Sequence, residues 1–127
     1  MIRLELPLAP SVNRLWRTTK TGGMYRSKVY IDWLEEAGWM IKQQTKDMIF
    51  GEYILHVAAV KPDKRHRDLD NLLKATSDLL VKMNIIQTDS ACRGIAAEWV
   101  DDGPPMTVTV YQTNEESLKW NQKTLMN

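Results

Sequence analysis

The nine residues KRHRDLDNL, at positions 64–72, place two aspartates directly after a basic run. Asp68 and Asp70 stand two residues apart, and three cationic side chains precede them, Lys64, Arg65 and Arg67. Hard divalent cations bind carboxylate oxygens, and Mg²⁺ often takes only one or two protein carboxylates together with substrate phosphate. Neighbouring Lys and Arg side chains can bind the flanking phosphates. These residue types therefore predict metal-dependent chemistry on a phosphate.

The same aspartates also have a purely structural explanation. Asp is favoured at the N-cap and in the first turn of a helix, where the helix dipole contributes about 0.3–1 kcal/mol each. Lys74 lies four residues after Asp70, so the two side chains share one edge of a helix and can form a weak ion pair. For a single aspartate the structural explanation is favoured. Two aspartates behind a basic run favour metal and phosphate binding.

Other acidic motifs fit this stretch less well. An EF-hand loop starting at Asp68 would need an oxygen ligand at its fifth position and Gly at its sixth, where Leu72 and Leu73 stand. A nucleophilic aspartate in an Asp-x-Asp motif usually follows a buried strand directly, whereas KPDKRHR intervenes here.

Asp89, in the stretch NIIQTDSA, is the candidate for a third carboxylate at this site. The chain can double back after the helix and bring Asp89 to the two aspartates, but Asp-Ser is also ordinary turn chemistry. Spacing alone favours the turn. Asp78 continues the polar edge of the helix beyond Lys74, and we expect it to be solvated rather than functional.

Strands and helices that could position these side chains are visible in the hydrophobic pattern. Alternation predicts a strand at 2–6, and β-branched runs predict strands at 52–60, 94–100 and 106–113. The five residues DDGPP join the last two strands, which predicts a hairpin. Residues 9–27, with their turn residues and Gly-Gly pair, are predicted to form a long basic loop.

Two helices are predicted. Ser27 is a plausible N-cap for a helix that runs to about Lys46, whose apolar face would be formed by Val29, Trp33, Ala37, Met40 and Ile41. Residues 68–83 have the clearest helical pattern in the chain, and Asn84 is placed where a left-handed C-cap belongs. The order of elements predicts one small α/β (α+β) domain over residues 1–127, with a mixed sheet, two main helices and a polar C-terminal tail at 114–127.

The composition is that of an ordinary globular domain. The chain has 127 residues, of which 43% are hydrophobic. No apolar run approaches the roughly 18 residues of a membrane span, so no membrane association is expected. Cys92 is the single cysteine, which excludes an internal disulfide and a multi-cysteine zinc site. A reducing, cytoplasmic location is the default expectation.

The charge is unevenly distributed along the chain. Up to Arg67 there are twelve Lys/Arg and seven Asp/Glu, a net charge of +5, and after it five and nine, a net charge of −4. A basic half is typical of a protein with a polyanionic partner, although charge alone slightly favours a merely solvated surface. In the basic loop, Trp16 and Tyr25 stand among cationic residues, where aromatic rings can stack on unpaired bases or pack inward.

The motifs PDKRHRDLDNLLKATSDLL and IIQTDS, together with the N-terminal PLAPSVNRLW, resemble the RusA family of Holliday junction resolvases. The resemblance spans roughly Ile2 to Thr113. One departure is visible, because Thr88-Asp89 stands where the family commonly has two aspartates. The resemblance implies an α+β fold and a homodimeric endonuclease of DNA recombination and repair that cuts four-way junction DNA, encoded by a bacterium, phage or prophage.

The resemblance also implies roles for individual residues. Asp68, Asp70 and Asp89 would bind Mg²⁺, for which Mn²⁺ is a plausible substitute, and Lys74 would complete the catalytic set. Contacts to DNA are expected from eight residues: Asn13, Arg14, Arg17, Lys20, Arg26, Lys64, Arg65 and Arg67. Two alternatives stay open, a non-catalytic protein that binds branched DNA and a nuclease for other branched or flap DNA.

Overall fold

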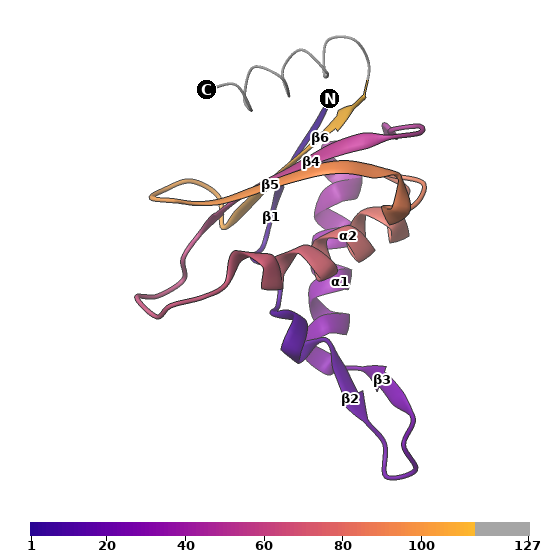
Figure 1. Ribbon diagram of the computed structural model, residues 1–127, viewed down its shortest axis with the longest axis vertical. Helices are drawn as coiled ribbons and strands as arrows, with labels where there is room; N and C mark the ends of the chain where they lie inside the picture. The colour runs from indigo at the N-terminus through magenta and orange to yellow at the C-terminus, as the bar shows by residue number, and fades with distance from the viewer. Residues whose placement is uncertain (114–127) are drawn as a thin grey trace.

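The computed structural model describes residues 1–113, which form a four-stranded sheet, two helices on one of its faces and a small projecting hairpin (Figure 1). The strands of the sheet are β1 (Ile2–Leu6), β4 (Tyr53–Val60), β5 (Cys92–Val100) and β6 (Met106–Gln112). The helices are α1 (Lys28–Gln44) and α2 (Leu73–Lys82), and the hairpin consists of β2 (Trp16–Thr18) and β3 (Met24–Arg26). Three short 3₁₀ turns lie at Val12–Arg14, Leu69–Leu72 and Asp89–Ala91.

The sheet is mixed, as predicted, with the strand order β1-β6-β4-β5. β6 pairs antiparallel with both β1 and β4, and β4 pairs parallel with β5. Alternate residues of β4, including Leu55, Val57 and Ala59, are completely buried and face the helices. The four strands thus provide one wall of the core, and the small α+β fold with a mixed sheet is confirmed.

The predicted hairpin between the last two strands is wrong, because β4 lies between β5 and β6. Val60, at the end of β4, pairs with Val100, and Met106 pairs with Ala59 on the other side. The intervening DDGPP segment therefore crosses the end of β4, where the Val60 N–H donates to the Pro105 carbonyl at 3.0 Å. Five residues are enough to cross two strand spacings of about 4.8 Å each.

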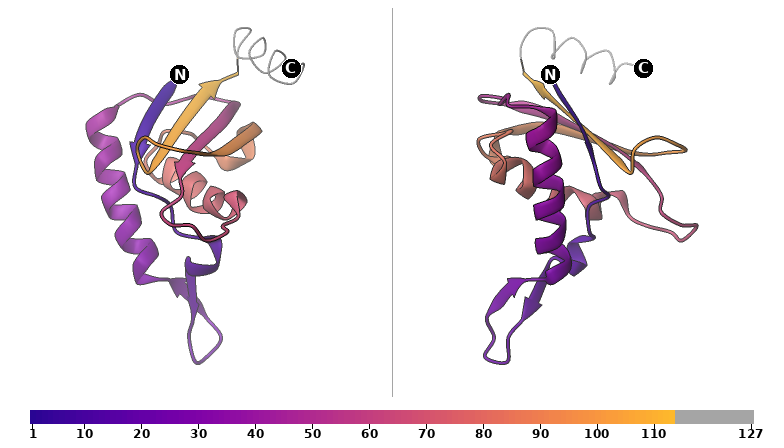
Figure 2. Two further views of the ribbon diagram at one scale, coloured as in Figure 1. Left: turned by 90° about the vertical axis from the view of Figure 1, so that its left-hand side faces the viewer. Right: turned by 180° about the vertical axis from the view of Figure 1, so that it is seen from behind.

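Ser27 caps α1 as predicted, its hydroxyl accepting the Tyr30 N–H at 3.1 Å. The predicted apolar face is displaced by one residue at its start. Tyr30 is fully buried, whereas Val29 is 38% exposed. Trp33, Ala37 and Ile41 are buried as expected, and both helices cover the same face of the sheet (Figure 2).

The helix predicted over residues 68–83 is α-helical only in its second part. A 3₁₀ turn over Leu69–Leu72 precedes α2, and the Asp68 side chain makes no capping hydrogen bond. The first residues are therefore wound more tightly than a continuous α-helix, which changes the directions of Asp68 and Asp70 relative to Lys74. Asn84 has a φ of 58°, which confirms the predicted left-handed residue after the helix.

The basic segment predicted as a loop contains the hairpin β2–β3, in which Trp16 pairs with Arg26 and Thr18 with Met24. Gly22 closes its turn at a φ of +91°, and the Thr19 N–H donates to the Gly23 carbonyl at 2.7 Å. Strands of three residues are too short to show a period. Figures 1 and 2 show this hairpin projecting from the end of the molecule at which α1 begins, and we call residues 16–26 the hairpin arm.

The polar tail predicted at 114–127 lies outside the described residues, so the expectation of a single domain over the whole chain stays a prediction. Among residues 1–113, no helix has the length and apolar character that crossing a membrane requires.

Candidate functional site

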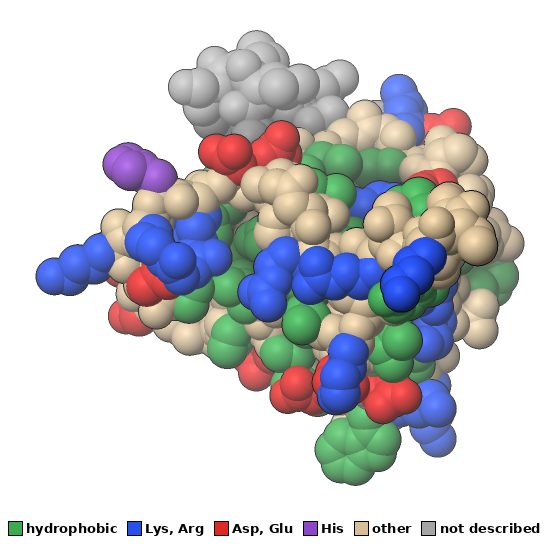
Figure 3. Space-filling view, turned by 90° about the horizontal axis from the view of Figure 1, so that it is seen from below, with side chains coloured by type: hydrophobic (Ala, Val, Ile, Leu, Met, Phe, Trp, Pro, Cys, Tyr) green, Lys and Arg blue, Asp and Glu red, His purple; other side chains and the backbone are tan. Residues whose placement is uncertain are grey.

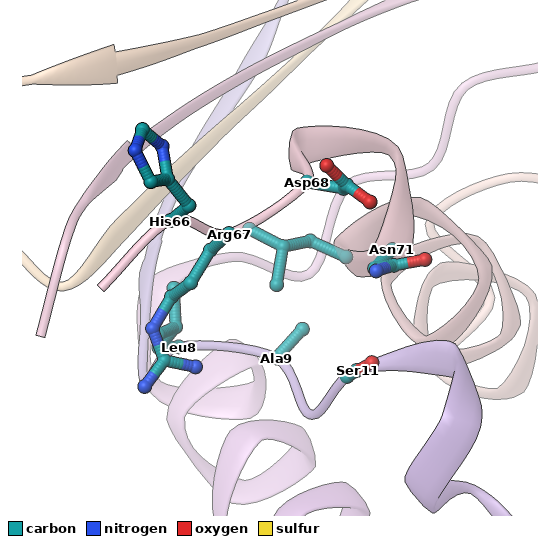
Figure 4. A pocket seen from close by; sticks show the side chains of 8 residues that line it. Leu8, Ala9, Ser11, His66, Arg67, Asp68 and Asn71 are labelled. Atoms are coloured by element: carbon teal, nitrogen blue, oxygen red, sulfur yellow. The ribbon is translucent and has the colours of Figure 1, made fainter.

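Asp68 lies in a hollow of about 280 Å³ where the N-terminal segment meets the turn before α2 (Figure 4). Ser11, Asn71 and Asp68 contribute polar groups, and Leu8, Ala9 and Leu72 form apolar walls. Figure 4 shows the Asp68 carboxylate and the Asn71 amide on the same side of the turn, whereas the Arg67 guanidinium extends in the other direction, toward Leu8. We call this the Asp68 hollow.

Asp63 holds both arginines of the basic run. Its carboxylate accepts Arg67 Nη2 at 2.7 Å and Arg65 Nη2 at 3.0 Å, and Nε of each arginine donates to it at 3.2 Å. The two guanidinium groups hold the pKa of Asp63 well below its usual range, and Asp63 raises the pKa of Arg67. The loop between β4 and α2 therefore has an internal ion-pair network, which was not among the predictions from the sequence.

Lys74 and Asp89 line a second, more open hollow of about 470 Å³ beside α2. Its walls come from three parts of the chain. Lys74 and Asp78 belong to α2, Asp89 to the turn before β5, and Trp16 and Arg26 to the hairpin arm. We call this the Lys74 hollow, and it brings the predicted lysine and the third predicted carboxylate to one surface.

Asp78 is not the solvated residue expected from the sequence. Its carboxylate accepts the Tyr30 hydroxyl at 2.9 Å and Lys74 Nζ at 3.1 Å. Lys74 is therefore paired with Asp78 on the following turn of α2 rather than with Asp70 on the preceding one. The tight 3₁₀ turn at Leu69–Leu72 removes Asp70 from the regular α-helical positions that an i,i+4 pair requires.

The three carboxylates predicted to bind a metal are exposed and available. Within residues 1–113, no hydrogen bond or ion pair engages the side chains of Asp68, Asp70 or Asp89. The same part of the chain contains no group of three acidic, His or Cys side chains gathered closely enough to hold a metal ion. Asp68 and Asp89 line different hollows, and Asp70 lines neither of them. The oxygen donors fit a hard cation in kind, but they do not form a preassembled three-carboxylate cage.

The residues predicted to contact DNA, Asn13 and seven cationic side chains, are exposed apart from Arg67, which is half-buried. Asn13, Arg14, Arg17, Lys20 and Arg26 are exposed on the first 3₁₀ turn and the hairpin arm, and Lys64 and Arg65 are exposed on the loop before Asp68. From Pro7 to Ile31 the sequence contains no Asp or Glu. Figure 3, which views the molecule from the end that carries the hairpin arm, shows a band of Lys and Arg side chains across the middle of that face, with acidic side chains below the band and others above it.

Two aromatic side chains and a methionine interrupt the basic surface of the arm. Trp16, Met24 and Tyr25 are 41%, 64% and 52% exposed. Trp16 nevertheless contacts the body of the protein, with its ring centroid 6.4 Å from that of Tyr30 in an edge-to-face arrangement. Arg26 lies over the Tyr30 ring at 5.7 Å. The root of the arm is thus packed on α1, while its outer part is available to a partner.

Four residues in or next to the hollows have roles that the sequence patterns did not predict. Asn71 and Asp78 line the hollows, and Asp63 and Tyr30 are hydrogen-bonded to residues that line them. Asp63 and Asp78 each have a basic residue four positions away, which is a usable but common signal. Asn71 directly follows Asp70, within the stretch whose pattern predicts a helix. Tyr30 gave no signal, because its role depends on the packing of α1 against α2.

Comparison with known proteins identifies the family of this chain. The family model described as endodeoxyribonuclease RusA matches residues 5–111, which include both hollows and the hairpin arm. A protein of Aquifex aeolicus (strain VF5), named crossover junction endodeoxyribonuclease RusA, is 32% identical over 87 residues, which cover 68% of each chain. The family match spans nearly all of the described residues, and the relative is similar over more than two thirds of both chains. The chain therefore belongs to the RusA family of endodeoxyribonucleases.

Proposed function

We propose that this protein is an endodeoxyribonuclease that resolves four-way DNA junctions by hydrolysing phosphodiester bonds. Membership of the RusA family over residues 5–111 carries the proposal. The exposed, unpaired carboxylates close to basic and aromatic side chains support it, because a protein that only binds DNA gains nothing from negative charge facing phosphate. Mixed charge of this kind is useful where a cation mediates between carboxylate and phosphate.

Asp68, Asp70 and Asp89 are the residues that would hold a divalent cation, with Mg²⁺ expected and Mn²⁺ as a substitute. A bound cation supplies a water of lowered pKa and offsets charge on the phosphoryl oxygens. Since the described residues form no closed cage, we propose that substrate phosphate oxygens complete the coordination, as is common for Mg²⁺. Asp68 and Asp70 would anchor the metal from the turn before α2.

Lys74 would act on the scissile phosphate itself. Its side chain is half exposed and lines the Lys74 hollow. Among residues 1–113 its ammonium group has one acceptor, Asp78, which leaves two of its three donor hydrogens for a substrate. A positive charge at this point can stabilise the negative charge that develops on the phosphoryl oxygens during in-line attack. Cleavage would leave a 5′-phosphate and a 3′-hydroxyl.

DNA would be bound by Asn13 and by cationic side chains of the N-terminal segment, the hairpin arm and the loop before Asp68. Lys64, Arg65 and Arg67 would contact phosphates close to Asp68, and Asn13, Arg14, Arg17, Lys20 and Arg26 would contact a neighbouring arm of the junction. Such contacts position the backbone without reading sequence. Trp16 and Tyr25 offer rings on which bases exposed at a branch point can stack.

We further propose a homodimer in a cytoplasmic setting. A four-way junction is nearly two-fold symmetric, and two identical sites related by a two-fold axis suit the paired cuts that resolution requires. The whole chain, including residues 114–127, would then act as one domain in each subunit.

A cleavage assay tests the proposal. An end-labelled synthetic four-way junction is incubated with the protein and Mg²⁺ or EDTA, beside linear duplex and flap DNA. We expect paired, symmetric, Mg²⁺-dependent cuts in the junction. Asp70→Asn should abolish cutting while junction binding persists or tightens, because it removes a charge that repels phosphate. Asp47→Asn, which changes an exposed aspartate beyond α1, is the matched control and should cut normally.

Two other outcomes would point to the alternatives. Junction binding without cutting under Mg²⁺ and Mn²⁺ would identify a non-catalytic binder. Faster cutting of flap than of four-way DNA would identify a nuclease for other branched substrates. Full activity of Asp70→Asn would show that this aspartate serves the start of the helix instead of a metal.

A further inference from the structure

Asp78 connects two helices through hydrogen bonds to its two carboxylate oxygens. Oδ2 accepts the hydroxyl of Tyr30 on α1 at 2.9 Å, and Oδ1 accepts Lys74 Nζ, from the same helix as Asp78, at 3.1 Å. The Asp78 side chain is only 26% exposed, whereas that of Lys74 is 51% exposed. The carboxylate thus lies between a buried donor behind it and a solvent-facing donor in the Lys74 hollow.

Tyr30, which donates to Asp78, is held in place by the residues around it. It is completely buried, its ring stacks on that of Trp33 at a centroid distance of 6.5 Å, and its N–H is bonded to the Ser27 hydroxyl. Burial and the neighbouring Asp78 carboxylate raise the pKa of Tyr30, so its hydroxyl stays protonated and serves as the donor. The packed Tyr30 ring restricts the position of Asp78 Oδ2 through this hydrogen bond. Because the carboxylate is planar, the position of Asp78 Oδ1, which accepts Lys74, is restricted as well.

We propose that Asp78 is a positioning residue for Lys74, which it holds in the Lys74 hollow through the anchor that Tyr30 provides. The inference deepens the proposed nuclease function and rests on the role given there to Lys74. A lysine has four rotatable side-chain bonds, and an ammonium group without an acceptor would sample many positions. A fixed acceptor reduces the entropy that must be lost when the ammonium group meets the phosphoryl oxygens.

An ordinary helix-surface ion pair is the competing explanation, and α1 contains one for comparison. Lys28 Nζ lies 2.7 Å from Asp32 Oδ2, with the same spacing of four residues. Those side chains are 87% and 57% exposed, and no described residue provides Asp32 with a second donor. The Lys74–Asp78 pair differs in its burial and in its bond to Tyr30, and these two differences carry the inference.

Three variants separate the possibilities. Asp78→Asn keeps the shape of the side chain but removes its charge, Tyr30→Phe removes only the anchoring hydroxyl, and Asp32→Asn is the matched control. Single-turnover cleavage rate and junction Kd are measured separately for each in the full-length protein. We expect the rate to fall about 10- to 100-fold for Asp78→Asn and by a smaller factor for Tyr30→Phe, because misplacing a reacting group by about 1 Å can cost a factor of that order. Kd should change by less than about twofold, and Asp32→Asn should match the wild type in rate.

A double-mutant cycle with Lys74→Ala gives the decisive readout. If Asp78 acts through Lys74, Asp78→Asn should slow cleavage no further in a protein that already lacks the lysine. An equal additional loss in that background would overturn the inference, as would a wild-type rate for both Asp78→Asn and Tyr30→Phe. Thermal melting identifies any variant that fails to fold, and Tyr30→Phe, which keeps the buried ring, supplies the test if Asp78→Asn is one of them.

Failure of the inference can be distinguished from failure of the proposed function. If the wild-type protein cuts junctions and Lys74→Ala does not, the nuclease proposal stands whatever Asp78→Asn does. If the wild-type protein does not cut under any metal, the proposed function fails first and the positioning role fails with it.

Discussion

Replacing Ser27 by Ala should destabilise the protein through a single buried hydroxyl. Ser27 is 1% exposed, and its Oγ both accepts the Tyr30 N–H at 3.1 Å and donates to the Arg14 carbonyl at 2.5 Å. It therefore caps α1 and also fastens the segment before the hairpin arm to that helix. The Ser27 N–H bond to the Leu15 carbonyl, at 2.9 Å, belongs to the backbone and should survive in the variant.

The magnitude follows from these two lost bonds. Loss of an N-cap side chain costs about 1 kcal/mol, and leaving a buried polar partner without a hydrogen bond costs about 1–3 kcal/mol. The Arg14 carbonyl belongs to an exposed residue and can recover part of that cost from water, so we expect a total loss of about 2 kcal/mol. For a chain of this length the unfolding entropy near the midpoint converts 2 kcal/mol into a fall in Tm of about 7 °C.

Urea unfolding measures the free energy of unfolding directly. The midpoint should fall while the slope m stays constant, because the folded and unfolded states expose the same surface as before. Ser11→Ala is the matched control. Ser11 caps only a three-residue turn, through a long 3.4 Å contact with the Asn13 N–H, so its loss should cost less than about 0.5 kcal/mol. Equal effects of the two substitutions would refute the reasoning that Ser27 fastens two segments.

Three further changes test other parts of the structure. Asp63→Asn should reduce the loss of stability on acidification. The lowered pKa of Asp63 means that its carboxylate stabilises the fold above about pH 4 and that this contribution is lost as the pH falls toward the folded pKa. Thermal melting at pH 5 and pH 3 measures the difference. Tyr53→Phe should reduce the loss of stability in alkali. Burial raises the pKa of Tyr53, so its contribution is complete below about pH 10 and falls above it, which urea midpoints at pH 9 and pH 11 would detect. Asn84→Ala should cost about 1 kcal/mol in urea unfolding, since Ala tolerates a φ of 58° poorly, whereas Asn84→Gly should cost nothing.

Sequence patterns predicted those elements whose signals are local and long enough to repeat. β1 matched its prediction at both ends, and β4 and α1 were found with correct starts within one residue. The left-handed Asn84 followed from its place after an apolar helical stripe. The start of each of these elements depends on residues within a few positions of one another, so a short stretch of sequence is enough to predict it.

The prediction that β5 and β6 pair was wrong because strand pairing depends on residues far apart in the sequence. DDGPP has the composition of a hairpin turn, but the edge of β6 that β5 would have used is occupied by β4, which is separated from β6 by more than forty positions. The strong apolar character of β4 favours the centre of the sheet, where both of its edges are paired. Residues 94–113 alone give no sign that β4 pairs with β6 in place of β5. The hairpin arm was missed for the opposite reason, since its strands of three residues are shorter than any usable period.

In the candidate site, too, the sequence predicted residues with a local signal and missed those that only packing brings together. The residue types around Asp68 and Asp70 indicated the chemistry, and the structure places Lys74 and Asp89 on one hollow, as a shared role for them requires. Asp78 and Tyr30 are 48 positions apart, and only the packing of α1 beside α2 joins them. The predicted apolar face of α1 is displaced by one residue at its start, so it includes the exposed Val29 and leaves out the buried Tyr30.

Tyr30 links the surface proposed to bind DNA with the lysine proposed to act on it. On one side its ring contacts Trp16 and Arg26 from the root of the hairpin arm, and on the other its hydroxyl holds Asp78. Because Tyr30 lies in the first turn of α1, where its N–H donates to the capping Ser27 hydroxyl, the arm, the helix and Lys74 are all connected to this one residue. A nuclease must hold its catalytic group in a defined position relative to the bound DNA. Tyr30 contacts both the hairpin arm, proposed to bind DNA, and Asp78, which holds Lys74, so it fixes the position of one relative to the other.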